Sequence, residues 1–163
     1  MRRLLAGAIL SVLLATPALA VTRDDPDDTA GRLDLRQVSR TFTNGPSAPA
    51  LVHMQAATYD RWTLRQCRHA EGGACSFTFA FDSRKGPGTD FVAVWHARGD
   101  GPECGVFNIR TERRLAEGDA AKYHRSAFCS FEKGLLHASH AVRWQVRSFW
   151  EFIDDAAPDR GWF

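Results

Sequence analysis

Closely spaced acidic side chains near the start of the chain are the residues best suited to chemistry. Asp25, Asp28 and Asp34 lie close together in the sequence, with Asp24 and Asp27 beside them. Calcium is a hard cation that takes six to eight oxygen ligands, which closely spaced aspartates and turn carbonyls can supply. The spacing differs from that of an EF-hand loop, which needs a glycine at its centre and a glutamate at its end.

Asp25, Asp28 and Asp34 are therefore the candidate calcium ligands, and calcium is the one cofactor that the sequence suggests. A solvated acidic leader would have the same composition and is the alternative. Asp34 stands between two leucines in a strand-like run. For this residue, a structural hydrogen bond or ion pair is a further alternative.

Aromatic residues suggest a second kind of chemistry, the stacking of sugar rings on exposed aromatic faces. The chain has five tryptophans and two tyrosines. Tyr59 and Trp62 stand at the start of a strand-like run, and Trp162 lies next to the C-terminal residue. These three rings are the best candidates for exposure and so the candidate ligand-binding residues. The alternative, which we favour for each ring, is that it fills the core or plugs an edge of the sheet.

The sequence contains none of the common catalytic motifs. It has no G-x-S-x-G elbow, no H-E-x-x-H helix, no phosphate-binding P-loop and no G-x-G-x-x-G turn. We therefore predict no catalytic residue and favour a non-catalytic protein. A small extracellular hydrolase, whose carboxylates or histidines converge only in the folded chain, is the alternative.

Four cysteines are expected to form two structural disulfides, Cys67–Cys75 and Cys104–Cys129. The first pair flanks a polar segment that contains two glycines, and the second pair lies in two strand-like runs that can be neighbours. A zinc site would need paired cysteines two to four residues apart, a spacing that this chain lacks.

Residues 1–20 are predicted to be a cleavable secretory signal. Arg2 and Arg3 precede an apolar run that is too short to span a bilayer, and Ala18 and Ala20 suit a signal peptidase. Cleavage after about Ala20 removes two of the 21 basic residues and none of the 19 acidic ones, which leaves a nearly neutral chain. We expect a secreted, extracellular protein with no membrane insertion after cleavage and no nucleic-acid partner.

The elements that hold these candidate residues in place are predicted to be short strands. Phe77, Phe79 and Phe81 alternate with small or polar residues, a pattern typical of a strand with one buried face. Residues 91–97, apart from His96, are apolar on both alternating sides of the run, as in a strand covered on both sides. Residues 113–122 are expected to hold a helical turn.

Seven to nine short strands separated by turn residues indicate an all-β fold, an antiparallel β-sandwich of jelly-roll type. We divide the chain into the signal peptide at residues 1–20, an acidic N-terminal segment at residues 21–32, and a single sandwich domain at residues 33–163.

Two segments at opposite ends of this domain resemble a known group of proteins. The opening segment is Asp25-x-x-Asp28-x-x-Gly31-x-Leu33-Asp34-Leu35, and the closing segment is Asp155-Ala156-Ala157-Pro158-Asp159-x-Gly161-Trp162. Together with the strands at Trp62 and Trp144 they resemble small secreted bacterial β-sandwich proteins of no established activity. That group is distantly similar in layout to carbohydrate-binding jelly-roll modules, so the resemblance implies a fold and a compartment.

We expect a secreted, non-catalytic binding or interaction module. Its first candidate partner is a glycan or another cell-surface or cell-envelope polymer. The alternatives are the small hydrolase described above and a secreted domain that binds or inhibits another protein through a loop or an edge strand.

Overall fold

The computed structural model describes residues 19–44, 49–71, 75–83, 88–137 and 142–163. Ten antiparallel strands form one curled sheet in the order β1-β2-β3-β8-β7-β6-β5-β4-β9-β10. The strands are β1 (Leu19–Asp24), β2 (Leu35–Thr43), β3 (Leu51–Thr58), β4 (Cys75–Asp82), β5 (Phe91–Arg98), β6 (Gly101–Asn108), β7 (Arg113–Tyr123), β8 (Ser126–Glu132), β9 (Arg143–Trp150) and β10 (Ile153–Ala157). The helices are the short α1 (Leu64–Arg68) and the 3-10 turn η2 (Lys133–Leu136). An all-β, antiparallel fold is thus confirmed.

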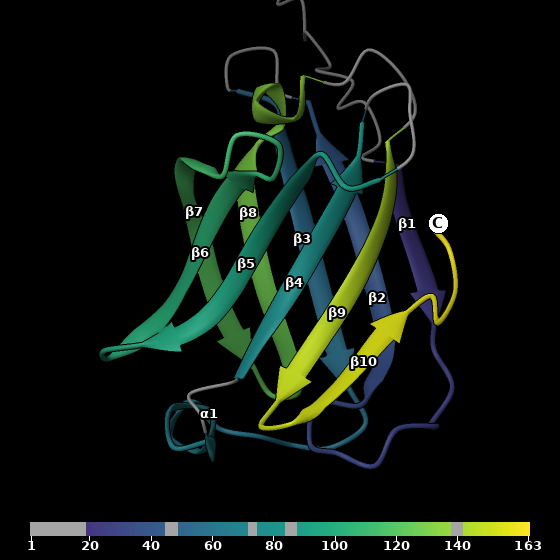
Figure 1. The fold of residues 1–163 in the computed structure, drawn as a ribbon, viewed down its shortest axis with the longest axis vertical. Coiled ribbons are helices and arrows are strands. Elements are labelled where there is room, and N and C mark those ends of the chain that lie inside the picture. Colours follow the sequence, from purple (N-terminus) through teal and green to yellow (C-terminus); the bar gives the residue numbers. More distant parts are fainter. Residues whose placement is uncertain (1–18, 45–48, 72–74, 84–87, 138–141) are drawn as a thin grey trace, which may run out of the picture.

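The sheet folds over on itself into two facing layers, which Figure 1 shows from one side. Strands β1, β2, β3 and β8 belong to one layer, and β6, β5, β4, β9 and β10 to the other. Strand β7 belongs to both, because residues 113–118 pair with β6 whereas residues 119–123 pair with β8.

Aromatic side chains fill the space between the layers. Phe77, Phe79 and Phe81 are fully buried, as their alternation predicts. Trp62 and Trp95 pack edge to face against each other, with ring centroids 5.3 Å apart. Burial of large rings of this kind supplies most of the free energy that stabilises such a core.

Both expected disulfides are present. Cys67–Cys75 ties the end of α1 to the start of β4, and Cys104–Cys129 joins β6 to β8 through the core. By loop entropy they contribute about 2.5 and about 3.5 kcal/mol to the free energy of unfolding, because the second closes the longer loop.

Three expectations about single segments are wrong. The run that starts at Trp62 is not a strand but leads into helix α1. Residues 113–122 form most of strand β7 rather than a helical turn, because they bridge the two layers of the sheet. Strand β5 is fully covered on one face only: Val92 and Val94 point outwards, are half-buried, and line an open hollow with Phe107.

The two edges of the curled sheet approach each other along a seam. Strand β10 lies against β2, and the N–H of Leu35 donates a hydrogen bond of 2.6 Å to Asp155 in β10. Farther along the seam, Arg40 donates a 2.5 Å hydrogen bond to the carbonyl of Val142. Among the described residues, no helix is long and apolar enough to cross a membrane.

Candidate metal centre

The acidic residues after β1 form the connection between β1 and β2, and this connection lies at the seam. The N–H of Asp25 donates to the carbonyl of Arg36, so that the segment leaves β1 and returns to β2 as a closed turn. Tyr59, which follows β3, holds the turn from the other side. Its hydroxyl donates to the carbonyl of Asp25 over 2.8 Å, and its backbone N–H donates to the carbonyl of Asp34.

The acidic segment therefore does not form a solvated leader. Residues 21–24 pair with β2 in strand β1, and the side chains of Asp25 and Asp34 are only 5% and 3% exposed. Residues 1–18, which hold most of the predicted signal peptide, lie outside the described part of the chain.

Strand β10 and the segment after it bring two more aspartates to the same place. Carboxylate oxygens of Asp25, Asp155 and Asp159 lie within 4.8 Å of one another, and so do those of Asp28, Asp34 and Asp155. The two triads share Asp155. We call these five residues the aspartate cluster.

Asp155 belongs to both triads of the aspartate cluster and is held by several hydrogen bonds. One of its oxygens accepts the hydrogen bond from Leu35, and the other accepts from its neighbour Ala156 over 2.7 Å and from Thr29 over 3.3 Å. These bonds fix the carboxylate in position, and the oxygen that accepts only from Leu35 keeps acceptor capacity for a further partner.

Two buried oxygens in the cluster have no hydrogen-bond partner in the structure, Asp25 Oδ2 and Asp34 Oδ1. A buried polar atom without a partner costs roughly 1–3 kcal/mol, and more when it is charged. Of the ion pairs between described side chains, none involves a member of the cluster. The cluster thus concentrates negative charge around three buried carboxylates, with no ion pair to a cationic side chain in the described part of the chain.

This concentration of charge raises the affinity of the carboxylates for protons. Burial and the charge of Asp155 raise the pKa of Asp25 to about 7, from an ordinary value of 3.8. Burial and a hydrogen bond with Asp27 raise the pKa of Asp34, also to about 7. The pKa of Asp155 is raised by burial, although its backbone hydrogen bonds act in the opposite direction.

Carboxylate oxygens gathered in this way are the ligands that hard divalent cations prefer, and calcium accepts them mono- or bidentately. Asp25, Asp28 and Asp34, the candidate ligands from the sequence, do converge, but Asp155 places them in two triads rather than one. Asp155 and Asp159 were not among the candidates, although both belong to the closing segment of the resemblance. These two residues approach the other three aspartates only in the folded chain, where β10 lies against β2.

The three aromatic candidates for ligand binding have different surroundings. Trp62 fills the core, which is the alternative to exposure: it is 1% exposed and packs on Phe77 and Trp95, and the Nζ of Lys122 lies 4.6 Å from its ring centroid. Tyr59 is half-buried and supports the acidic turn. Trp162 is partly exposed in the C-terminal segment and stays a candidate.

Comparisons with protein-family models, with curated proteins and with solved structures find no match for this chain.

Proposed function

We propose that the protein is a secreted, non-catalytic binding module in which the aspartate cluster holds calcium. The observation that carries the calcium proposal is the pair of buried, unpartnered oxygens, Asp25 Oδ2 and Asp34 Oδ1. A divalent cation held by either triad would supply a partner for the unpartnered oxygen in it. It would also offset the repulsion between the carboxylates.

The ligand set favours calcium over other metals. All the candidate ligand atoms are carboxylate oxygens, whereas zinc prefers cysteine and histidine. Magnesium demands near-ideal octahedral geometry and keeps several waters, while calcium tolerates irregular arrangements of six to eight oxygens. Both disulfides favour an oxidising compartment such as the extracellular space, where even a weak calcium site can fill.

Calcium in this place would join the two ends of the domain. Asp25, Asp28 and Asp34 belong to the β1–β2 connection, whereas Asp155 and Asp159 belong to β10 and the segment after it. Its role would be structural: the ion would close the seam and hold a rigid sheet, the kind of scaffold on which a binding surface keeps its shape.

Calcium titration of the purified mature protein by isothermal calorimetry tests the proposal. The informative variant is Asp159→Asn, because Asp159 is the exposed member of its triad and its replacement leaves the core intact. We expect calcium affinity to fall at least tenfold. Asp154→Asn is the matched control, since Asp154 is exposed, lies next to Asp155 and belongs to neither triad.

The control should bind calcium as the unmodified protein does. If the unmodified protein releases or absorbs no heat of binding at millimolar calcium, or if both variants keep the full affinity, the cluster is not a calcium site.

A further inference from the structure

Strands β1, β2, β3, β8 and the second half of β7 present an outward surface that we call the polar face. The register of these strands places one side chain from each in rows that cross the layer. One row contains Thr41, His53, Ser130 and Asp119, and the next contains Thr22, Ser39, Gln55, Phe128 and Ala121. A third row contains Asp24, Gln37, Ala57, Ser126 and Tyr123.

Hydrogen bonds between neighbouring strands hold these side chains in place. His53 is hydrogen-bonded to Ser130 through Nδ1, over 2.8 Å, and to Thr43 through Nε2, over 3.2 Å. Gln55 Nε2 donates to Ser126 over 3.2 Å. Side chains fixed in this way lose little conformational entropy when a ligand binds, and each hydroxyl or amide group keeps further hydrogen-bonding capacity.

An aromatic ring lies in the middle row of the polar face. Phe128 is half-buried, and the residue opposite it on β7 is the small, exposed Ala121. A second ring, that of Tyr123, is 67% exposed in the adjoining row. A ring surrounded by hydroxyl and amide groups is the arrangement that suits a sugar, which has an apolar ring face and polar edges.

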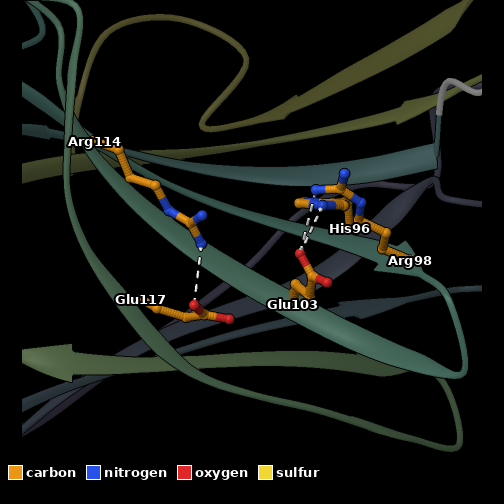
Figure 2. Close-up of polar contacts among 5 residues, drawn as sticks. All are labelled: His96, Arg98, Glu103, Arg114 and Glu117. Carbon is orange, nitrogen blue, oxygen red and sulfur yellow. Dashed lines mark ion pairs between the residues drawn. The ribbon is translucent and has the colours of Figure 1, made fainter.

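The charge of the polar face indicates what kind of sugar it suits. The three rows contain no lysine or arginine among the described residues, and their only ionisable carboxylates are Asp24 and Asp119 at opposite margins. The outward side of β5, β6 and β7 differs, because ion pairs occupy it (Figure 2). There Glu103 pairs with His96 and Arg98, and Arg114 pairs with Glu117. An anionic polymer would meet repulsion at the polar face, whereas an uncharged one would not.

We infer that the polar face binds a neutral polysaccharide, with Phe128 stacking on a sugar ring and Gln55 and Ser126 contacting its hydroxyls. This inference rests on the proposed function in one respect, that the protein is a binding module, and it names the class of ligand. It does not depend on the occupancy of the aspartate cluster.

The test is the retention of the mature protein on insoluble cellulose, chitin, mannan and β-1,3-glucan, with alginate and heparin as anionic polymers. We expect saturable binding to at least one neutral polymer and a loss of affinity of about tenfold or more in Phe128→Ala. Gln55→Ala should also weaken binding. Phe107→Ala is the matched control, because it removes a half-buried phenylalanine from the outward side of the other layer. It should bind normally.

Three outcomes would overturn the inference: no binding to any of the neutral polymers, a preference for alginate or heparin, or full binding by Phe128→Ala. Circular dichroism of each variant shows whether the substitution leaves the fold intact. Repeating the assay with a calcium chelator shows whether polymer binding needs the ion. The two proposals fail separately, because the calcium titration tests the aspartate cluster and the polymer assay tests the polar face.

Discussion

Asp25 and Asp34 show how strongly a carboxylate depends on its neighbours. Both side chains are buried, both have a pKa raised to about 7, and each has one oxygen without a partner. A carboxylate of this kind is stabilised either by a proton or by a cation. Protons bind such a carboxylate better at low pH, whereas a cation binds it better at high pH. The pH dependence of stability therefore distinguishes the two.

We predict that the calcium-free protein loses stability as the pH rises from about 4 to about 7. In the folded state the pKa of Asp25 and of Asp34 is about 7, whereas it is near the ordinary 3.8 when the chain is unfolded. A raised pKa in the folded state contributes stability that is complete below the unfolded pKa and is lost as the pH passes the folded value. Thermal melting in a chelator across this range measures the effect.

Asp34→Asn is the comparison for this prediction, because an amide does not titrate. The decline in melting temperature from pH 4 to 7 should be shallower in Asp34→Asn than in the unmodified protein. Parallel curves for the two proteins would mean that Asp34 has an ordinary pKa and that the charge of the cluster is balanced in some other way.

At the scale of elements, strand β7 connects the two layers of the sheet, because it pairs with β6 and then with β8. Gly118 lies where β7 passes from pairing with β6 to pairing with β8, beside the Cys104–Cys129 disulfide. A Cβ atom at Gly118 would lie 2.5 Å from the carbonyl oxygen of Ser130 and 3.2 Å from the Sγ of Cys104. Glycine is therefore required here by the close approach of backbone and disulfide.

We predict that Gly118→Ala lowers the free energy of unfolding by about 1–3 kcal/mol, because the backbone and the disulfide must shift to admit one methyl group. Urea denaturation measures the change. Gly134→Ala is the control, since a Cβ there would contact nothing within 4 Å. Equal stabilities of the two variants would show that β7 adjusts without cost.

The elements that the sequence predicted well are those with a local signal. The alternation of Phe77, Phe79 and Phe81 indicates a half-buried strand directly. The short, glycine-containing segment between Cys67 and Cys75 favoured the first disulfide, and the strand-like runs around Cys104 and Cys129 favoured the second. Residues 113–122 gave no such signal, because their partners change midway from β6 to β8 and their side chains are mostly exposed or half-buried.

The candidate metal centre was predictable only in part. The opening aspartates are close in sequence and so could be grouped from the sequence alone. Asp155 lies 120 residues beyond Leu35, whose N–H it binds, and only the topology of the sheet brings β10 to β2. The choice between an exposed and a buried Trp62 stayed open for a similar reason, since its burial depends on Phe77 in β4 and Trp95 in β5.

At the scale of the whole molecule, contacts across the seam join the two ends of the curled sheet. The backbone of the C-terminal Phe163 exchanges hydrogen bonds with Trp144, and its ring packs on Trp144 with centroids 4.8 Å apart. Arg40 lies nearby between the rings of Phe42 and Trp144. The aspartate cluster closes the same seam at the β1–β2 connection, so calcium there would govern the stability of the entire domain.

The most direct test of the calcium proposal is the melting temperature of the mature protein at pH 8 in millimolar calcium and in excess chelator. A ligand present at 100 times its dissociation constant adds about 2.7 kcal/mol to the stability of the folded state. For a domain of this size we therefore predict a melting temperature higher by roughly 5–10 °C in calcium. A melting temperature that is the same in calcium and in chelator would contradict the proposal that the aspartate cluster is a calcium site.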